Sequence, residues 1–188
     1  MPSHWSATAS GFDTLVRAMD AAAKHRVRVS RGGDSETQVL TGLPVLDHLI
    51  GVLAEHAGFA LQLELAPTGA DAEVAAAGAA LGEALAELLE GNVRGHGSAT
   101  LPADEALAHV TVEASGRALV VSNVDLSDAG VGGLGSDLLS RFLHELAEGA
   151  GLTLHVRLLH GDDARHVLEA IFKALGVALA QASRRKDA

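Results

Sequence analysis

The feature that most constrains this chain is an internal repeat, because two stretches about ninety residues apart follow one pattern. His48 stands nine residues before an Ala-Gly pair at 57–58, and Arg141 stands nine residues before a second Ala-Gly pair at 150–151. After each pair comes a run of alternating apolar residues, which is typical of a half-buried strand. The shared spacing indicates that the chain contains two copies of one structural unit.

The match extends beyond these runs, with one extra residue in the second copy. Residues 71–75 line up with 165–169, and both segments lead into a helical pattern that reaches a Leu-Gly pair, at 81–82 in one copy and at 175–176 in the other. The helices that follow the alternating runs are therefore part of the repeat.

The two copies differ in chemistry at one pair of positions. His166 and Glu169 are three residues apart, so a helix places them on one face, where they offer two ligands to a divalent metal. The first copy has Ala72 and Ala75 at these positions. The sequence therefore predicts that one half can ligate a metal and the other cannot.

The apolar pattern predicts an α+β fold in which two repeats, residues 1–93 and 94–188, form one compact domain. The elements expected in the first repeat are a helix over 13–24, strands over 25–30 and 36–40 joined at the turn 32–34, a helix from Pro44, a strand over 59–65 and a helix over 72–90. Those expected in the second are strands over 107–114 and 117–123 joined at the turn 115–117, a helix over 136–148, a strand over 152–159 and a helix over 164–183. Segment 91–104 is expected to be an irregular joint between the repeats, and the glycine-rich segment 130–135 a linker.

Composition limits the class of protein to which this chain can belong. The 188 residues are 48% hydrophobic and include no cysteine, so a proper core is expected and thiolate ligands and disulfides are excluded. No apolar run approaches the ~18 residues of a membrane span, and no basic segment leads into an apolar one at the start. We expect a soluble cytoplasmic protein.

Charge argues against nucleic acid as a partner, because 24 acidic residues face 14 basic ones and the net charge is −10. The one basic cluster, residues 24–28, has the alternation of an exposed strand, and anion binding is the alternative reading. With 3% aromatic residues, the chain also lacks platforms for base stacking.

Several motifs resemble those of the imidazoleglycerol-phosphate dehydratase family, in the same order and at most of the same spacings over residues 25–183. The motifs are 41–49 (TGLPVLDHL), 55–59 (EHAGF), 101–108 (LPADEALA), 115–117 (SGR), 151–159 (GLTLHVRLL) and 166–175 (HVLEAIFKAL). The resemblance implies a duplicated unit in which each half is a four-stranded sheet packed on a helix pair. It also implies a trimer-based shell of 24 subunits, and two manganese ions at subunit interfaces that stabilise the deprotonated substrate imidazole.

The resemblance also implies a set of eight metal ligands, six histidines and two glutamates, which this chain retains in part. Three ligand positions keep a ligand: His48, His166 and Glu169. Five positions are replaced: Asp71, Ala72, Ala75, Arg141 and Arg165. Asp71 is an oxygen ligand in place of a nitrogen ligand, so it is kept as a residual candidate.

The two arginines oppose metal binding on electrostatic grounds. A guanidinium about 5 Å from a dication costs on the order of several kcal/mol at an effective dielectric constant of about 20. Guanidinium groups stay protonated at any working pH, so they cannot become metal ligands. We expect manganese to be weak or absent, and Glu169 and Asp71 are acids with which Arg141 and Arg165 could instead form salt bridges.

Substrate contacts carried over from the family are also incomplete. Arg117 occupies the position of an arginine that holds the substrate phosphate, and Arg94 lies near a second one with its spacing off by one residue. Ala21 falls near the acid–base glutamate, and the C-terminal Ser-Thr-Lys-Gly segment is missing. No residue is assigned a catalytic role.

These residues leave three functions open. The first is a dehydratase-like protein linked to histidine biosynthesis, with weak or no activity alone, which forms a homo-oligomer or co-assembles with an active paralogue. The second is an active lyase with a mixed-subunit site or a site rebuilt from His144, Asp71, His48 and His166. The third is a non-catalytic binding module for a phosphorylated or imidazole ligand.

Overall fold

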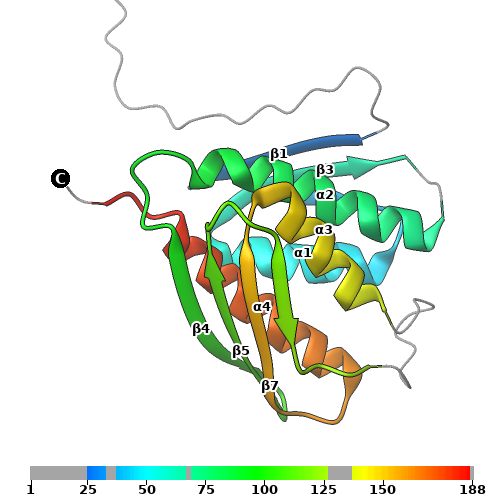
Figure 1. The fold of residues 1–188 in the computed structure, drawn as a ribbon. Coiled ribbons are helices and arrows are strands. Elements are labelled where there is room, and N and C mark those ends of the chain that lie inside the picture. The colour runs from blue at the N-terminus through cyan, green and yellow to red at the C-terminus, as the bar shows by residue number, and fades with distance from the viewer. Residues whose placement is uncertain (1–24, 33–36, 67–68, 127–136, 187–188) are drawn as a thin grey trace, which may run out of the picture.

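A computed structural model describes residues 25–32, 37–66, 69–126 and 137–186 of the chain (Figure 1). The elements of the first repeat are β1 (His25–Arg31), β2 (Gln38–Leu40), α1 (Pro44–Ala57), β3 (Phe59–Leu65) and α2 (Ala70–Leu89). Those of the second are β4 (His96–Ala103), β5 (Ala106–Glu113), β6 (Leu119–Ser122), α3 (Leu138–Ala150), β7 (Thr153–His160) and α4 (Ala164–Ala182).

The sheet topology confirms the predicted duplication. In the first sheet β3 lies between β1, which is antiparallel to it, and β2, which is parallel. In the second sheet β7 lies in the same way between β5, which is antiparallel, and β6, which is parallel, while β4 extends the sheet beyond β5. The second sheet has the four strands that the resemblance implies, and the first has three among the described residues. The expected helix over 13–24 and the linker 130–135 lie outside those residues.

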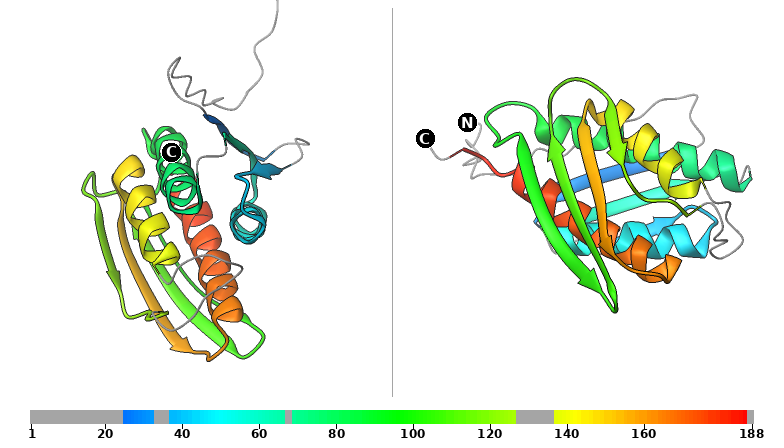
Figure 2. Two further views of the ribbon diagram at one scale, coloured as in Figure 1. Left: turned by 90° about the vertical axis from the view of Figure 1, so that its right-hand side faces the viewer. Right: turned by 60° about the horizontal axis from the view of Figure 1, so that its bottom comes forward.

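The four helices lie between the two sheets (Figure 2). Helices α1 and α2 contact the first sheet, and α3 and α4 contact the second. Across the middle α2 packs on α3 and α1 packs on α4, so each helix pair joins one repeat to the other. Among the described residues, no helix combines the length and apolarity needed to cross a membrane.

Strand β3 shows why the alternating sequence folds as it does. Phe59, Leu61, Leu63 and Leu65 are buried toward the helices, while Gln62 and Glu64 between them are exposed. The Ala-Gly pair before each such strand ends a helix: Gly58 has φ 64° and Gly151 has φ 62°, a left-handed conformation that glycine adopts without strain. The repeat seen in the sequence is therefore a helix, a glycine cap and a strand.

The two Leu-Gly pairs mark where helices approach most closely. A Cβ atom at Gly82 of α2 would lie less than 3.0 Å from the Leu146 carbonyl oxygen of α3. A Cβ atom at Gly176 of α4 would meet the Leu53 carbonyl oxygen of α1 in the same way. Since Leu53 and Leu146 occupy equivalent repeat positions, the same contact is built twice.

Three expectations about the strands are wrong. Strands β1 and β2 do not pair as a hairpin, nor do β5 and β6, because β3 and β7 insert between them. Segment 91–104 is not an irregular joint, since 96–103 is strand β4, paired with β5 along its length. Its inward positions include Gly97, where a side chain would collide with the Ala178 backbone of α4. Such close packing favours small residues, so the sequence of β4 does not show the alternation of apolar and polar side chains that is typical of a strand.

Candidate functional site

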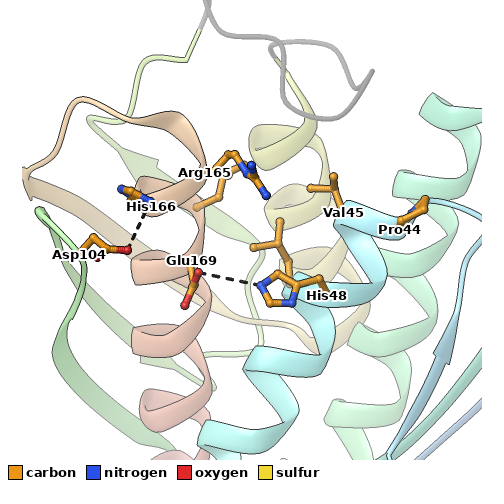
Figure 3. A pocket seen from close by; sticks show the side chains of 9 residues that line it. Pro44, Val45, His48, Asp104, Arg165, His166 and Glu169 are labelled. Carbon is orange, nitrogen blue, oxygen red and sulfur yellow. Dashed lines mark ion pairs between the residues drawn. The ribbon is translucent and has the colours of Figure 1, made fainter.

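A pocket of about 470 Å³ opens between the N-terminal turns of α1 and α4 and the β4–β5 turn (Figure 3). It is lined by Pro44, Val45, His48, Leu49, Asp104, Arg165, His166, Leu168 and Glu169. The structure therefore brings the three predicted residual ligands, His48, His166 and Glu169, to one place. Their juxtaposition follows from the packing of α1 on α4.

The β4–β5 turn is tied to the start of α4 by hydrogen bonds. Asp163 caps the helix, and its carboxylate accepts from the backbone N–H groups of Arg165 at 2.8 Å and His166 at 3.4 Å. The Asp163 N–H in turn donates to Glu105 Oε1 at 3.1 Å. Asp104 has φ 47°, a left-handed conformation that aspartate tolerates in tight turns. The position of His166 is thus fixed from two sides.

Both ring nitrogens of His166 face carboxylates. Nδ1 lies 2.5 Å from Glu105 Oε2, and Nε2 lies 3.4 Å from Asp104 Oδ2. The hydrogen bond to Glu105 raises the pKa of His166 above its usual 6.5. Hydrogen bonds from the Asp163 backbone and from His166 lower the pKa of Glu105 to about 2. Below the raised pKa of His166, the two side chains form a pair of opposite charges.

Glu169 is also paired. Lys173, one helical turn further along α4, places Nζ 2.7 Å from Glu169 Oε1, while His48 Nε2 lies 4.0 Å from Glu169 Oε2. The hydrogen bond from Lys173 lowers the pKa of the Glu169 carboxyl, so this carboxylate is ionised and neutralised by a neighbouring cation. The side chain of His48 is 63% exposed, so its ring is open to a ligand.

Arg165 projects into the pocket. Its side chain extends from the first turn of α4 toward Val45 on α1 (Figure 3). Neither Arg141 nor Arg165 forms the salt bridge with Glu169 or Asp71 that the sequence left open: over the described ranges, no ion pair involves either arginine. Glu169 takes the nearer Lys173 instead.

Sequence reasoning missed three residues that shape this pocket: Asp104, Glu105 and Lys173. A signal for Lys173 was present, because its i,i+4 spacing from Glu169 is that of a helical ion pair. The adjacent acids Asp104 and Glu105 stand within a motif already singled out, but nothing in the sequence indicates that their turn contacts α4.

The donors of this pocket do not fit a manganese ion within one chain. In the described part of the chain, no group of three or more histidine, aspartate or glutamate side chains is arranged to hold a metal. His166 has both nitrogens directed at carboxylates, and Glu169 is neutralised by Lys173. To bind a divalent cation, both side chains would have to release their present partners.

The remaining ligand candidates lie elsewhere. Asp71 and Ala72 are exposed on the first turn of α2, and neither they nor Ala75 line the pocket with His48. His144 lines a separate pocket of about 290 Å³ between α3 and β6. Within one chain the structure does not bring His144 and Asp71 together with His48 and His166.

The two candidate phosphate arginines are likewise outside this pocket. Arg94 lines a pocket of about 330 Å³ and donates from Nε to His96 Nε2 at 3.2 Å. Arg117 is exposed in the turn after β5, where its N–H donates to Ser115 Oγ at 3.3 Å. A site that joins either arginine to His48 is not formed by one chain.

Two further observations concern residues outside the pocket. Arg26 and Arg28 are exposed on β1, opposite Glu64 and Gln62, which confirms an exposed strand for this part of the basic cluster, while Lys24 lies outside the described residues. His56 lies in the last turn of α1, with Nδ1 2.9 Å from the Val52 carbonyl oxygen, and contributes to the end of that helix.

Comparison with known proteins agrees with the motifs. A family profile described as imidazoleglycerol-phosphate dehydratase matches residues 41–179. The imidazoleglycerol-phosphate dehydratase of Pelobacter propionicus is 38% identical over 164 residues, which are 85% of this chain and 84% of the relative. That of Desulforudis audaxviator is 37% identical over 175 residues, 90% of this chain and 89% of the relative.

Solved structures show the same likeness. The crystal structure of imidazoleglycerol-phosphate dehydratase from Staphylococcus aureus superposes with a TM-score of 0.84 at 28% identity, covering 92% of this chain and 99% of the other. The enzyme from Pyrococcus furiosus in complex with (S)-C348 gives 0.78 at 30% identity, covering 92% and 95%. The chain therefore belongs to the imidazoleglycerol-phosphate dehydratase family, which is linked to histidine biosynthesis.

Proposed function

We propose that this chain is an imidazoleglycerol-phosphate dehydratase-like protein with weak or no dehydratase activity of its own. One observation carries the proposal: in the pocket between α1 and α4, two of the three candidate ligands are already engaged with other side chains and a guanidinium projects beside them. His166 is held by Glu105 at 2.5 Å and Glu169 by Lys173 at 2.7 Å. Arg165 adds positive charge where the resemblance expects a metal ion.

The family reaction removes a carbon-bound proton from the substrate, so it needs a basic group as well as metal ions. Metal ions, when bound, supply that chemistry by stabilising the deprotonated imidazole. In this pocket Glu105 and Glu169 have lowered pKa values, so both are weak bases. The raised pKa of His166 favours its protonated form, which cannot accept a proton.

A turnover assay tests the proposal. The purified protein, supplied with manganese, should dehydrate imidazoleglycerol phosphate at least ~100-fold more slowly than an intact relative such as the Staphylococcus aureus enzyme, because lost ligands and acid–base groups typically cost that much. The relative, prepared and assayed in parallel, controls for substrate and metal quality. Turnover within about tenfold of that of the relative would contradict the proposal.

One observation favours an active lyase with a mixed-subunit site as the second candidate. Arg94 and Arg117 are exposed and lie outside the pocket of His48, so they can meet it only across a contact between chains. Co-expression with an intact relative separates the two candidates. A co-purified assembly whose turnover exceeds that of the relative's own subunits would support the mixed-subunit lyase.

The same proposal includes a homo-oligomer larger than a dimer, built as a trimer-based shell, or co-assembly with an active paralogue. Support comes from three large apolar side chains that are exposed among the described residues, Leu40 at 49%, Leu119 at 37% and Leu159 at 56%. They lie on strands β2, β6 and β7, whose apolar surface a neighbouring subunit would cover. Light scattering at micromolar concentration should give a mass above that of a dimer, and a monomer would contradict this part of the proposal.

A further inference from the structure

The charged groups around the pocket between α1 and α4 are unevenly matched. Glu169 has Lys173 as its partner, and Glu105 has His166. Asp104 lies 3.4 Å from His166, on the side of that ring away from the Arg165 guanidinium (Figure 3). Arg165 has no ion-pair partner within the part of the chain that the structure describes. The pocket therefore contains a guanidinium that makes no ion pair, while the carboxylates of Asp104 and Asp163 add negative charge close to it.

The apolar part of the pocket lining strengthens the attraction of this cation for an anion, and the carboxylates of Asp104 and Glu169 oppose it. Apolar side chains of Val45, Leu49 and Leu168 line the pocket beside it. Near apolar walls the effective dielectric constant is lower than in water, so a charge-assisted hydrogen bond is stronger there. The exposed ring of His48, on the α1 side, offers a further hydrogen-bonding group. The volume of about 470 Å³ falls in the range of small-molecule pockets.

We infer that this pocket binds, without a metal ion, a small molecule that carries a phosphate or carboxylate group, and that Arg165 holds this group. The planar fork of a guanidinium donates two parallel hydrogen bonds to two oxygens of such a group. The inference rests on the proposed absence of metal chemistry, because a bound dication would compete with the guanidinium for the same space. This class of ligand follows from Arg165. The retained metal-ligand positions alone would not predict it.

Calorimetry with the full-length protein in EDTA tests the inference. Inorganic phosphate and acetate are the two probes, and at least one should bind. Arg165→Gln should weaken that binding about tenfold or more, the loss expected when a charge-assisted hydrogen bond is removed. Tighter binding of phosphate would indicate a phosphorylated ligand, and tighter binding of acetate a carboxylic acid. If neither probe binds, or if Arg165→Gln binds as well as the natural protein, the inference is overturned.

Arg157→Gln is the matched control, since Arg157 is an exposed arginine on β7 that does not line the pocket. It should bind both probes like the natural protein, and an equal loss in the two variants would mean non-specific charge attraction and overturn the inference.

A chemical measurement on the natural protein covers the case in which Arg165→Gln fails to fold. Saturating phosphate or acetate should slow the modification of Arg165 by phenylglyoxal, read by mass spectrometry, and leave the rate at Arg157 unchanged. Equal rates at Arg165 with and without the anion would overturn the inference. Because these tests are free of metal and of substrate, their failure is distinct from dehydratase turnover, which would instead overturn the proposed function.

Discussion

The α1–α4 and α2–α3 helix pairs are equivalent contacts between the two repeats, but they carry different side chains. Their packing is alike, with Gly82 and Gly176 each pressed against the carbonyl oxygen of an equivalent leucine. Their chemistry is not. The α1–α4 pair brings His48 to Glu169, whereas the equivalent positions of the other pair hold Arg141 and Ala75.

This difference separates what the fold requires from what a reaction requires. A glycine at a helix contact is fixed by sterics, because any side chain there would force two helices apart. The His48 side chain is exposed and that of Glu169 is half-buried, so replacing either one leaves the buried contact between the helices intact. The fold is therefore kept in both repeats while the chemistry has diverged, as expected when function resides in a site carried by a fold.

The largest expected effect tests the similarity of the two pairs. Gly82→Val and Gly176→Val should each destabilise the protein by about 1–3 kcal/mol, because each added side chain would overlap the facing backbone. Chemical denaturation measures both variants. Gly51→Ala in α1 is the control, since nothing lies within 4 Å of its added Cβ, and it should stabilise by about 0.5–1 kcal/mol. If only one of the two valine variants lost stability, the two helix contacts would not be equivalent.

A smaller effect, on the pH dependence of stability, tests the difference between the two helix pairs. The ion pair between Glu105 and His166 lies beside the α1–α4 contact. At the α2–α3 contact, Ala72 stands at the position equivalent to His166. The pKa of Glu105 is lowered from 4.5 to about 2, so its stabilisation is present above pH 4.5 and is lost as the pH falls toward 2. The pKa of His166 is raised above 6.5, so its stabilisation is present below pH 6.5 and is lost as the pH rises through the folded value. The pair should thus stabilise most between pH 4.5 and 6.5.

Thermal unfolding of the natural protein and of Glu105→Gln, followed across pH, measures this window. The difference in Tm should be small, because both side chains are reached by solvent. It should be greatest inside the window and shrink on both sides. Glu87→Gln, at an exposed position of α2, should show no such dependence. A difference in Tm that is the same at every pH would contradict the account of the pair.

Much of the fold could be predicted from the sequence, because local patterns encode it. The strand over 59–65 and the helix starts at Pro44 and Ala164 were predicted at their observed positions. Strand pairing could not be predicted locally, since β1 and β2 are near in sequence but each pairs with β3. Strand β4 was missed because its packing on α4 favours small residues such as Gly97.

The candidate site was predictable in its residues and not in their partners. His166 and Glu169 follow from helical spacing. Their contacts with Glu105 and His48 depend on which turn reaches α4 and which helix packs beside it, and sequence periodicity does not specify tertiary pairing. The absence of an ion pair at Arg165 could not be predicted either. Glu169, one helical turn from Arg165, pairs with Lys173 instead.

The metal content of the protein tests most directly whether the two repeats have lost their metal chemistry. Protein expressed with manganese and dialysed without chelator should carry well under one ion per chain by elemental analysis, because tight sites need a near-complete set of ligands and Arg165 adds charge where an ion would lie. His166→Ala should leave that value unchanged. Two ions per chain retained through gel filtration, or one ion that is lost in His166→Ala, would contradict the account.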